Sequence, residues 1–126
     1  MNQKPTILIV EDEPEIRSVM QETLESIGVH ILTAGNGQEA LGKLEENLSV
    51  SLILLDLMMP VMNGWQFLAE IDKNPVLKKI PIIVVTVFSD QAKDLKVRGV
   101  IKKPFDLNDL IKEVNDILKP IAISSQ

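Results

Sequence analysis

The alternation of short aliphatic runs with longer helical patterns restricts the fold of this chain more than any other feature. Five runs rich in Ile, Val and Leu are separated by segments in which apolar residues recur at helical spacing. The runs are Ile7 to Val10, Ile31 to Thr33, Leu52 to Leu55, Ile82 to Val85 and a weaker Val100 to Ile101. Strands buried on both faces of a parallel sheet have such continuous apolar sequences. The pattern therefore predicts an α/β fold in which helices cover both faces of a five-stranded parallel sheet.

The segments between these runs carry the apolar stripes of amphipathic helices. Pro14 suits the first turn of the first helix, and Gly28 supplies a stop at its end. In chain order the stripes are Ile16, Val19, Met20, Leu24 and Ile27; Ala40, Leu41, Leu44 and Leu48; Phe67, Leu68 and Ile71; and Leu107, Leu110, Ile111, Val114, Ile117 and Leu118. With a further helix after the fourth run, they predict five strand–helix units in a doubly wound arrangement.

The helix after the fourth run is expected to be short. Only residues 87 to 98 separate Thr86 from Gly99, which starts the fifth run. A crossover between parallel strands needs about a dozen residues at minimum. We therefore predict a shortened fourth helix from Asp90 to Val97, with Ser89 as its cap.

Length and composition predict one domain. The chain has 126 residues, a usual size for a single domain. No Pro/Gly/Ser-rich linker, repeat or low-complexity tract divides it. We expect the domain to span residues 1–120 and a short C-terminal tail to span residues 121–126.

Charge and composition exclude several functional classes. The formal charge of −5, from 18 acidic and 13 basic residues, opposes the phosphate backbone and argues against direct nucleic-acid binding by this chain. No apolar run approaches membrane-spanning length, and the run before Glu11 is too short for a signal peptide. The lack of cysteine excludes a disulfide framework and agrees with a reducing compartment. We expect a cytoplasmic protein that does not bind membranes.

Polar side chains follow several of the predicted strands. Ligands of open parallel sheets bind beyond the carboxyl ends of the strands, so the residues at these ends carry the chemistry. They are Glu11, Asp12 and Glu13 after the first run, Asp56 after the third, Thr86 after the fourth, and Lys102 and Lys103 before Pro104 after the fifth. If the strands are parallel, all of these residues meet at one rim.

The carboxylates at this rim call for a cation. At about 5 Å apart, two carboxylates repel by roughly 3 kcal/mol at an effective dielectric near 20. A few hard oxygen ligands that remain open to water suit Mg²⁺ better than zinc or a complete calcium cage. A carboxylate beside Mg²⁺ can attack a phosphoryl group and form an aspartyl phosphate. The metal, a lysine and a threonine hydroxyl would then contact the phosphoryl oxygens.

The segments VEDE, LLDLMMPVMNGWQFL, VVT and KKPF stand in an order and spacing that resembles the receiver domain of bacterial response regulators. The resemblance covers roughly residues 5 to 119. It implies the flavodoxin-like strand order 2-1-3-4-5, which a chemotaxis member of this family has.

The resemblance also implies a role for individual residues. Asp56 would be the phosphoacceptor, and Asp12, Asp56 and the backbone carbonyl of Met58 would coordinate Mg²⁺. Glu11 would bind the metal directly or through a water. Thr86 would hydrogen-bond one phosphoryl oxygen, and Lys103 would pair with another.

Two further positions fit the same resemblance. Pro104 would follow a cis peptide bond that aims Lys103, and Gly64 would relieve crowding where the chain enters the third helix. Val100 departs from the pattern, since the family commonly has an aromatic ring three positions before the lysine. A valine cannot signal by a ring rotation, which puts the usual output face of the family in doubt.

The resemblance predicts a phosphoacceptor domain of a two-component phosphorelay. Its donor would be the phosphohistidine of a histidine kinase or phosphotransfer protein, and its output would be contact with a downstream protein effector. The domain would catalyse its own phosphorylation without being a turnover enzyme.

Two other functions compete with this prediction. A Mg²⁺-dependent phosphatase of the haloacid dehalogenase type also forms an aspartyl phosphate, but it has an Asp two residues after the nucleophile, where this chain has Met58. An interaction module that is never phosphorylated would not need Asp12, Asp56, Thr86 and Lys103 together.

Each of these residues also has a structural reading when it is taken alone. Acidic residues before Pro14 are common helix caps, and an Asp after a strand is often a turn residue. Met59 and Met62 are taken as core packing, since Met commonly fills gaps. His30 opens the second run, away from the rim, and is a poor candidate for catalysis. Trp65 lies outside the third apolar stripe. Two interpretations stay open for it: part of a contact surface, or a side chain that covers the edge of the sheet.

Overall fold

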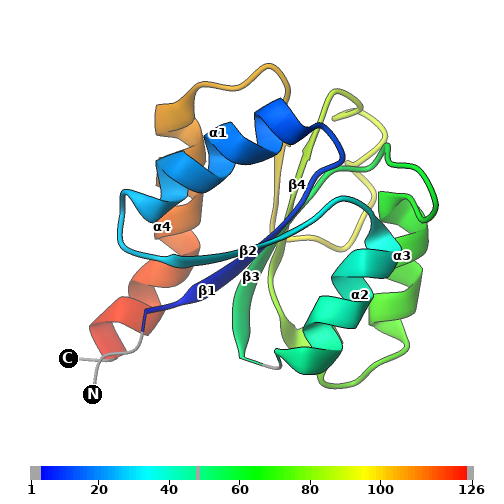
Figure 1. The fold of residues 1–126 in the computed structure, drawn as a ribbon, viewed down its shortest axis with the longest axis horizontal. Helices are drawn as coiled ribbons and strands as arrows, with labels where there is room; N and C mark the ends of the chain where they lie inside the picture. The colour runs from blue at the N-terminus through cyan, green and yellow to red at the C-terminus, as the bar shows by residue number, and fades with distance from the viewer. Residues whose placement is uncertain (1–3, 48, 125–126) are drawn as a thin grey trace.

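The computed structural model describes residues 4–47 and 49–124, and these residues form one parallel sheet with helices on both sides (Figure 1). The strand order is β2-β1-β3-β4-β5, and every neighbouring pair is parallel. The strands are β1 Thr6–Val10, β2 His30–Ala34, β3 Val50–Leu55, β4 Ile82–Thr86 and β5 Gly99–Lys102. The helices are α1 Pro14–Glu25, α2 Gly37–Glu46, α3 Gly64–Asp72 and α4 Leu107–Ser124, with a 3-10 turn, η1, at Leu77–Lys79. The predicted flavodoxin-like fold class and strand order are confirmed.

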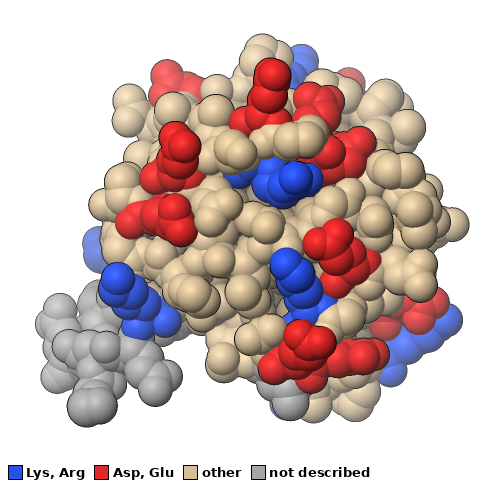
Figure 2. Space-filling view, in the orientation of Figure 1, with Lys and Arg blue, Asp and Glu red and all other residues tan. Residues whose placement is uncertain are grey.

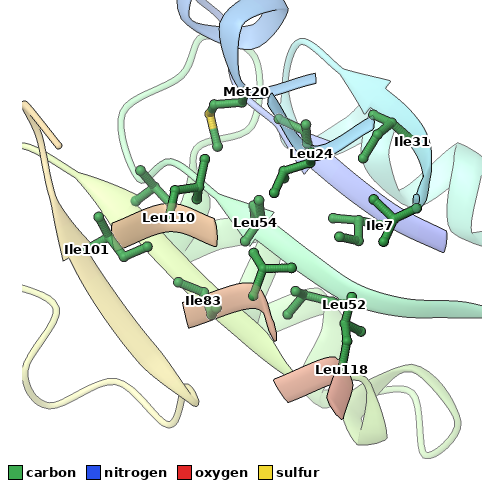
Figure 3. Packing of buried hydrophobic residues seen from close by; sticks show 14 residues of the cluster. Ile7, Met20, Leu24, Ile31, Leu52, Leu54, Ile83, Ile101, Leu110 and Leu118 are labelled. Carbon is green, nitrogen blue, oxygen red and sulfur yellow. The ribbon is translucent and has the colours of Figure 1, made fainter. Parts of the chain in front are cut away.

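The helices form one layer on each face of the sheet. Alternation along β1 sends Ile7 and Ile9 toward α1 and α4, and Leu8 and Val10 toward α2 and α3. Figure 3 shows the first of these two cores, in which Met20 and Leu24 of α1 pack over the sheet beside Leu110 of α4. The sheet is thus buried on both faces, which explains the continuous apolar runs.

The predicted helix from Asp90 to Val97 is wrong. Residues 87–98 form successive turns, in which Gln91 N–H donates to Phe88 O at 3.1 Å and Ala92 N–H donates to Ser89 O at 3.2 Å. The connection must return along β4, which at about 3.3 Å per residue is about 16 Å long. An α-helix advances only about 1.5 Å per residue, so almost the whole connection would have to be helical. The described residues therefore contain four α-helices instead of the expected five.

Other boundaries follow local signals. Asn36 caps α2 by accepting from Glu39 N–H, and Asn63 and Gln66 form a capping box at the start of α3. Gly28 takes a positive φ of 91° after α1, as a stop residue does. Leu48, which the second stripe included, lies outside the described residues.

Two features lie at the limits of the predicted elements. Val19, assigned to the core face of α1, is 45% exposed, so that assignment is wrong. The last helix continues to Ser124, beyond the predicted end of the domain at residue 120. The domain boundaries themselves stay a prediction.

None of the described helices is long and apolar enough to cross a membrane.

Candidate functional site

Backbone hydrogen bonds hold the predicted site residues just past the carboxyl ends of the strands. Glu11 N–H donates to Ala34 O at 3.0 Å, and Asp56 N–H donates to Val10 O at 3.0 Å. Lys103 N–H donates to Thr86 O at 2.9 Å. These bonds extend the parallel ladders by one residue past the strands. The side chains therefore converge at the carboxyl edge of the sheet, as predicted.

An acidic cluster forms where β1 and β3 end. Glu11, Asp12 and Asp56 each place one carboxylate oxygen within 4.8 Å of the others. Glu11 and Asp56 are buried and Asp12 is half-buried. Figure 2 shows acidic side chains near the upper edge of the face that it presents. Carboxylates this close repel by about 3 kcal/mol per pair. The cluster consists of hard oxygen donors, so it fits a Mg²⁺ ion.

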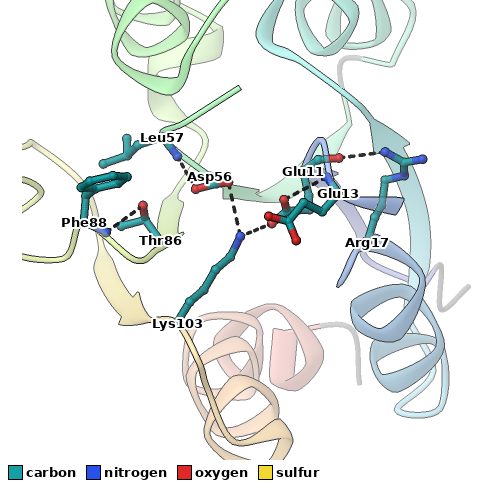
Figure 4. A network of polar contacts seen from close by, with 8 residues as sticks. All are labelled: Glu11, Glu13, Arg17, Asp56, Leu57, Thr86, Phe88 and Lys103. Carbon is teal, nitrogen blue, oxygen red and sulfur yellow. Dashed lines mark hydrogen bonds and ion pairs between the residues drawn. The ribbon is translucent and has the colours of Figure 1, made fainter. Parts of the chain in front are cut away.

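Lys103 reaches this cluster from the end of β5, and its ammonium lies between the carboxylates of Asp56 and Glu11 (Figure 4). Its Nζ lies 2.5 Å from Glu11 Oε1 and 3.3 Å from Asp56 Oδ2, and its side chain is 9% exposed. Burial lowers the pKa of Lys103, but the hydrogen bond and charge of Glu11, joined by those of Asp56, outweigh it and raise the pKa. Burial raises the pKa of Glu11 despite the opposing ammonium. Lys103 therefore holds its proton more tightly because of the two carboxylates, and Glu11 holds its proton more tightly chiefly because it is buried.

Local bonds fix the orientation of the Asp56 carboxylate. Its Oδ1 accepts from Leu57 N–H at 2.7 Å, and its Oδ2 accepts from Lys103 Nζ. Thr86 is fully buried, and its Oγ1 accepts from Phe88 N–H at 3.2 Å (Figure 4). The hydroxyl of Thr86 also has a proton to donate. Asp56 is therefore held before any ligand arrives.

The loop after Asp56 turns too tightly for a side chain at Gly64. A Cβ at this position would lie 2.6 Å from Asp56 O and 2.7 Å from Leu57 Cα. The Gly64 N–H donates to Leu57 O at 2.9 Å and closes the loop. Crowding at Gly64 is thus confirmed, and Asp56 and the start of α3 form one rigid corner.

The peptide bond between Lys103 and Pro104 is cis, as the resemblance implied. Met59 and Met62 pack against the core that α2 and α3 share, which confirms their structural role. His30 is exposed at the start of β2, at the opposite end of the sheet from the acidic cluster. Trp65 packs beside Leu57, Val84 and Ala92.

A groove of about 790 Å³ opens onto the cluster. Asp12, Asp56, Met58 and Lys103 line its polar end. Its apolar walls include Val19, Val87 and Leu107, all of them exposed. The site is therefore accessible to a ligand, while Glu11 and Thr86 stay buried beneath it. The backbone carbonyl of Met58 as a metal ligand stays a prediction.

Sequence analysis missed one residue that supports the site. Arg17 in α1 donates from Nη1 to the backbone oxygen of Glu11 at 2.9 Å. Glu13 N–H donates to Glu11 Oε2 at 3.2 Å, so both ends of Glu11 are held. A basic residue in the first turns of a helix opposes the helix dipole, and this was the available signal.

Comparison with known proteins decides the family. The family model described as the response regulator receiver domain matches residues 7–115. This chain belongs to the response regulator receiver domain family. Two solved members share its fold. Chemotaxis response regulator CheY4 of Vibrio cholerae is 30% identical with a TM-score of 0.84, over 92% of this chain and 100% of that one. Response regulator TrrA of Thermotoga maritima, solved in complex with Mg²⁺-BeF, is 35% identical with a TM-score of 0.80, over 90% of this chain and 99% of that one.

Curated relatives of this receiver domain include longer regulators. A probable transcriptional regulator, ycf29 of Pyropia yezoensis, is 36% identical over 117 residues, which are 89% of this chain and 52% of the relative. Response regulator RR06 of Streptococcus pneumoniae is 35% identical over 118 residues, which are 90% of this chain and 52% of the relative. The chain thus spans about half the length of these relatives. It is a signalling domain of the two-component type.

Proposed function

We propose that this receiver domain accepts a phosphoryl group on Asp56 from the phosphohistidine of a histidine kinase or phosphotransfer protein. The observation that carries the proposal is that the buried Asp56 carboxylate contacts Lys103 Nζ and lies within 4.8 Å of the carboxylates of Glu11 and Asp12. Glu11 has the same neighbours, but of these two buried carboxylates only Asp56 lines the groove that opens onto the cluster.

Asp12, Asp56 and the backbone carbonyl of Met58 would hold Mg²⁺, with Glu11 acting directly or through a water. Bound there, Mg²⁺ would neutralise charge on the phosphoryl oxygens. The similarity to TrrA, whose structure contains Mg²⁺-BeF, supports this assignment. The donor set of carboxylates and open positions also supports Mg²⁺ over softer metals.

The chain's own residues would perform the transfer. One Asp56 carboxylate oxygen attacks phosphorus and forms the acyl phosphate bond, while the bond from phosphorus to the imidazole nitrogen of the donor breaks and its electron pair stays on that nitrogen. Lys103 lies 3.3 Å from Asp56 and would pair with a phosphoryl oxygen. Thr86 would donate its hydroxyl proton to another phosphoryl oxygen.

We propose that the output is contact with a downstream protein, because the acidic charge of the chain opposes nucleic acid. A phosphatase that turns over would need an acid/base at position 58, and Met58 has no titratable group. The functions in the names of these regulators are not transferred to this chain, because it matches only about half of their length.

The test is to incubate the chain with Mg²⁺ and a small acyl phosphate donor, and then to measure the intact mass and map the modified residue. We expect the addition of one phosphoryl group on Asp56 and its loss in Asp56→Asn. Asp109→Asn removes the same charge from the exposed surface of α4 and should label like the parent. Labelling of Asp56→Asn, or a modification that maps to Asp12, contradicts the proposal.

A further inference from the structure

A second groove lies at the other end of β4 from the phosphorylation site. It has a volume of about 590 Å³ and lies between α3, the η1 turn and residues 95–98. Ile80, Pro81 and Ile82 at the start of β4 form part of its wall. None of its lining residues belongs to the acidic cluster. We call it the α3 groove, and we propose that it binds an acidic amphipathic segment of a partner protein.

The α3 groove exists because turns replace a helix between β4 and β5. On the α3 side of these strands, residues 87–98 contribute Ala92, Leu95 and Val97 to a small apolar cluster. Leu57, Val84 and Trp65 complete that cluster. Side chains alternate along β5, so Val100 faces this side, opposite to the buried Ile101. Val100 is 38% exposed because no helix lies over it. A helix of normal length would have covered this part of the sheet.

The floor of the α3 groove is apolar. Trp65 and Leu68 reach it from α3, and Leu95 and Val97 reach it from the chain before β5. All four side chains are half-buried, so each offers apolar surface to a ligand. A half-buried Trp beside aliphatic side chains is a favourable anchor point in protein interfaces.

The rim of the α3 groove is basic, in contrast to the acidic chain. Its charged residues are Lys78, Lys79, Lys96 and Arg98 against the single acid Asp72. Within the described part of the chain, none of these four cations makes an ion pair. All four are exposed. A basic rim on a chain with a charge of −5 attracts acidic groups and orients their approach.

The backbone beneath these cations is fixed. Arg98 N–H donates to Ile82 O at 2.8 Å, which holds the segment before β5 against β4. Asn74 Oδ1 accepts from Val76 N–H at 2.9 Å and from Leu77 N–H at 3.0 Å, and this bonding holds the η1 turn that carries Lys78 and Lys79. The two basic edges therefore keep their separation without a ligand.

An apolar floor between basic edges matches an amphipathic protein segment with acidic flanks. A flat bilayer does not enter a concave groove. The phosphates of nucleic acid would meet four cations on a chain whose other surface repels them. The occupant we commit to is therefore a protein segment with apolar side chains on one face and Asp or Glu beside them. This inference does not depend on phosphorylation of Asp56.

Trp65 provides the measurement. The chain has one Trp and no Tyr, so its fluorescence reports on the α3 groove. The probe is a synthetic helical peptide with Leu at helical spacing and Glu at the other positions, and its counterpart carries Lys in place of Glu. We expect a saturable change in Trp65 emission with the Glu peptide, weakening with salt, and none with the Lys peptide.

Charge reversal separates binding in the groove from general attraction. Lys96→Glu/Arg98→Glu should weaken binding of the Glu peptide about tenfold or more. Lys4→Glu/Lys112→Glu makes the same change in net charge at positions outside the groove and should bind like the parent. Melting curves of both variants check that the fold is unchanged.

Three outcomes overturn the proposal. They are the lack of a saturable response to the Glu peptide, equal binding by the parent and Lys96→Glu/Arg98→Glu, and a response to anionic vesicles or to a single-stranded oligonucleotide that exceeds the response to the peptide.

Discussion

Lys103 Nζ lies 2.5 Å from Glu11 Oε1, although 92 positions of the sequence separate the two residues. The contact joins the chain after β5 to the end of β1 and brings the ammonium within 3.3 Å of Asp56. One buried cation thus faces two buried carboxylates, with the half-buried Asp12 beside them. The remaining negative charge has consequences for stability, for metal binding and for the lifetime of a phosphoryl group.

The first prediction concerns pH. The pKa of Glu11 is raised, chiefly by burial, so the folded chain holds this proton more tightly than the unfolded chain. The stabilising contribution of Glu11 is therefore complete below pH 4.5, its ordinary pKa, and is lost as the pH rises through the raised value. Relative to the parent, the free energy of unfolding of Glu11→Gln should rise with pH above 4.5.

Urea unfolding with EDTA over a pH series measures this difference. Glu45→Gln removes a carboxylate from the exposed surface of α2 and is the matched control. A Glu11→Gln difference that stays constant or falls as the pH rises would contradict the expected direction.

The second prediction concerns Mg²⁺. A ligand that binds only the folded chain stabilises it by RT ln(1 + [L]/Kd), about 2.7 kcal/mol at a hundredfold excess over Kd. Mg²⁺ should therefore raise the melting temperature. Asp12→Asn should reduce that rise and increase the metal-free stability, because one repelling charge is removed. The gain should be below the Coulomb value of about 3 kcal/mol, since Asp12 is partly exposed.

The measurement is a pair of melting curves with EDTA and with millimolar Mg²⁺. Asp109→Asn changes an exposed carboxylate that is not part of the cluster, and it should respond to Mg²⁺ as the parent does. An unchanged melting temperature of the parent in Mg²⁺ would exclude the acidic cluster as a metal site.

The fold and the polar cluster were predictable because their signals are local. Buried parallel strands give apolar runs, and the residues that end those runs must meet once the strands are parallel, as Asp56 and Lys103 do. Gly64 was predictable from the resemblance, and its crowding against Asp56 O is evident only from the backbone path.

The remaining features depend on geometry that a sequence pattern does not contain. Whether residues 87–98 form a helix depends on the length of β4 that they must cross. Val19 has helical spacing, yet it lies at the margin of the core and borders a groove. Arg17 contacts a backbone oxygen of Glu11. Its place near the start of a helix is a signal in the sequence, but residue types do not show which backbone oxygen it contacts.

The third prediction concerns Gly64. A Cβ at this position would meet Asp56 O at 2.6 Å, and backbone cannot move aside as a flexible side chain can. Gly64→Ala should cost about 1–3 kcal/mol of stability and slow labelling of Asp56. Gly42→Ala is the control, because its Cβ would meet nothing within 4 Å in the middle of α2. That substitution should stabilise the chain by about 0.5–1 kcal/mol and leave labelling unchanged. Equal stability of the two variants in urea unfolding would refute this explanation of the corner at Asp56.

The fourth prediction concerns the conformational change. Thr86 and Lys103 would supply the differential contacts to the new oxygens, and Val100 has no ring to rotate. Hydrogen exchange with beryllofluoride and Mg²⁺ should therefore show protection in the loops after β4 and β3. Large changes centred on Val100 and α4, with none at residues 86–90, would contradict it. Asp56→Asn with the same additives is the control and should show no protection.

The last prediction is a long lifetime of the phosphorylated form. Hydrolysis of an acyl phosphate needs a water aligned behind phosphorus, and a side chain with a polar atom must orient that water. Met58 lines the groove beside Asp56 and is 52% exposed. Phe88 lies beside Thr86, joined to it by the bond from its own N–H (Figure 4). Neither side chain can orient or deprotonate water, and both take up space near the site.

The measurement is to phosphorylate the chain, remove the donor and follow the loss of the phosphoryl mass with time. Met58→Asn/Phe88→Glu should lose the group faster than the parent, because the new side chains can position water. Met58→Leu/Phe88→Leu keeps both positions apolar and controls for changes in packing, so its decay should stay close to that of the parent. If the polar variant decays no faster than the parent, access of water past Met58 and Phe88 does not set the lifetime. The geometry of Lys103 at Asp56 would then be the next feature to vary.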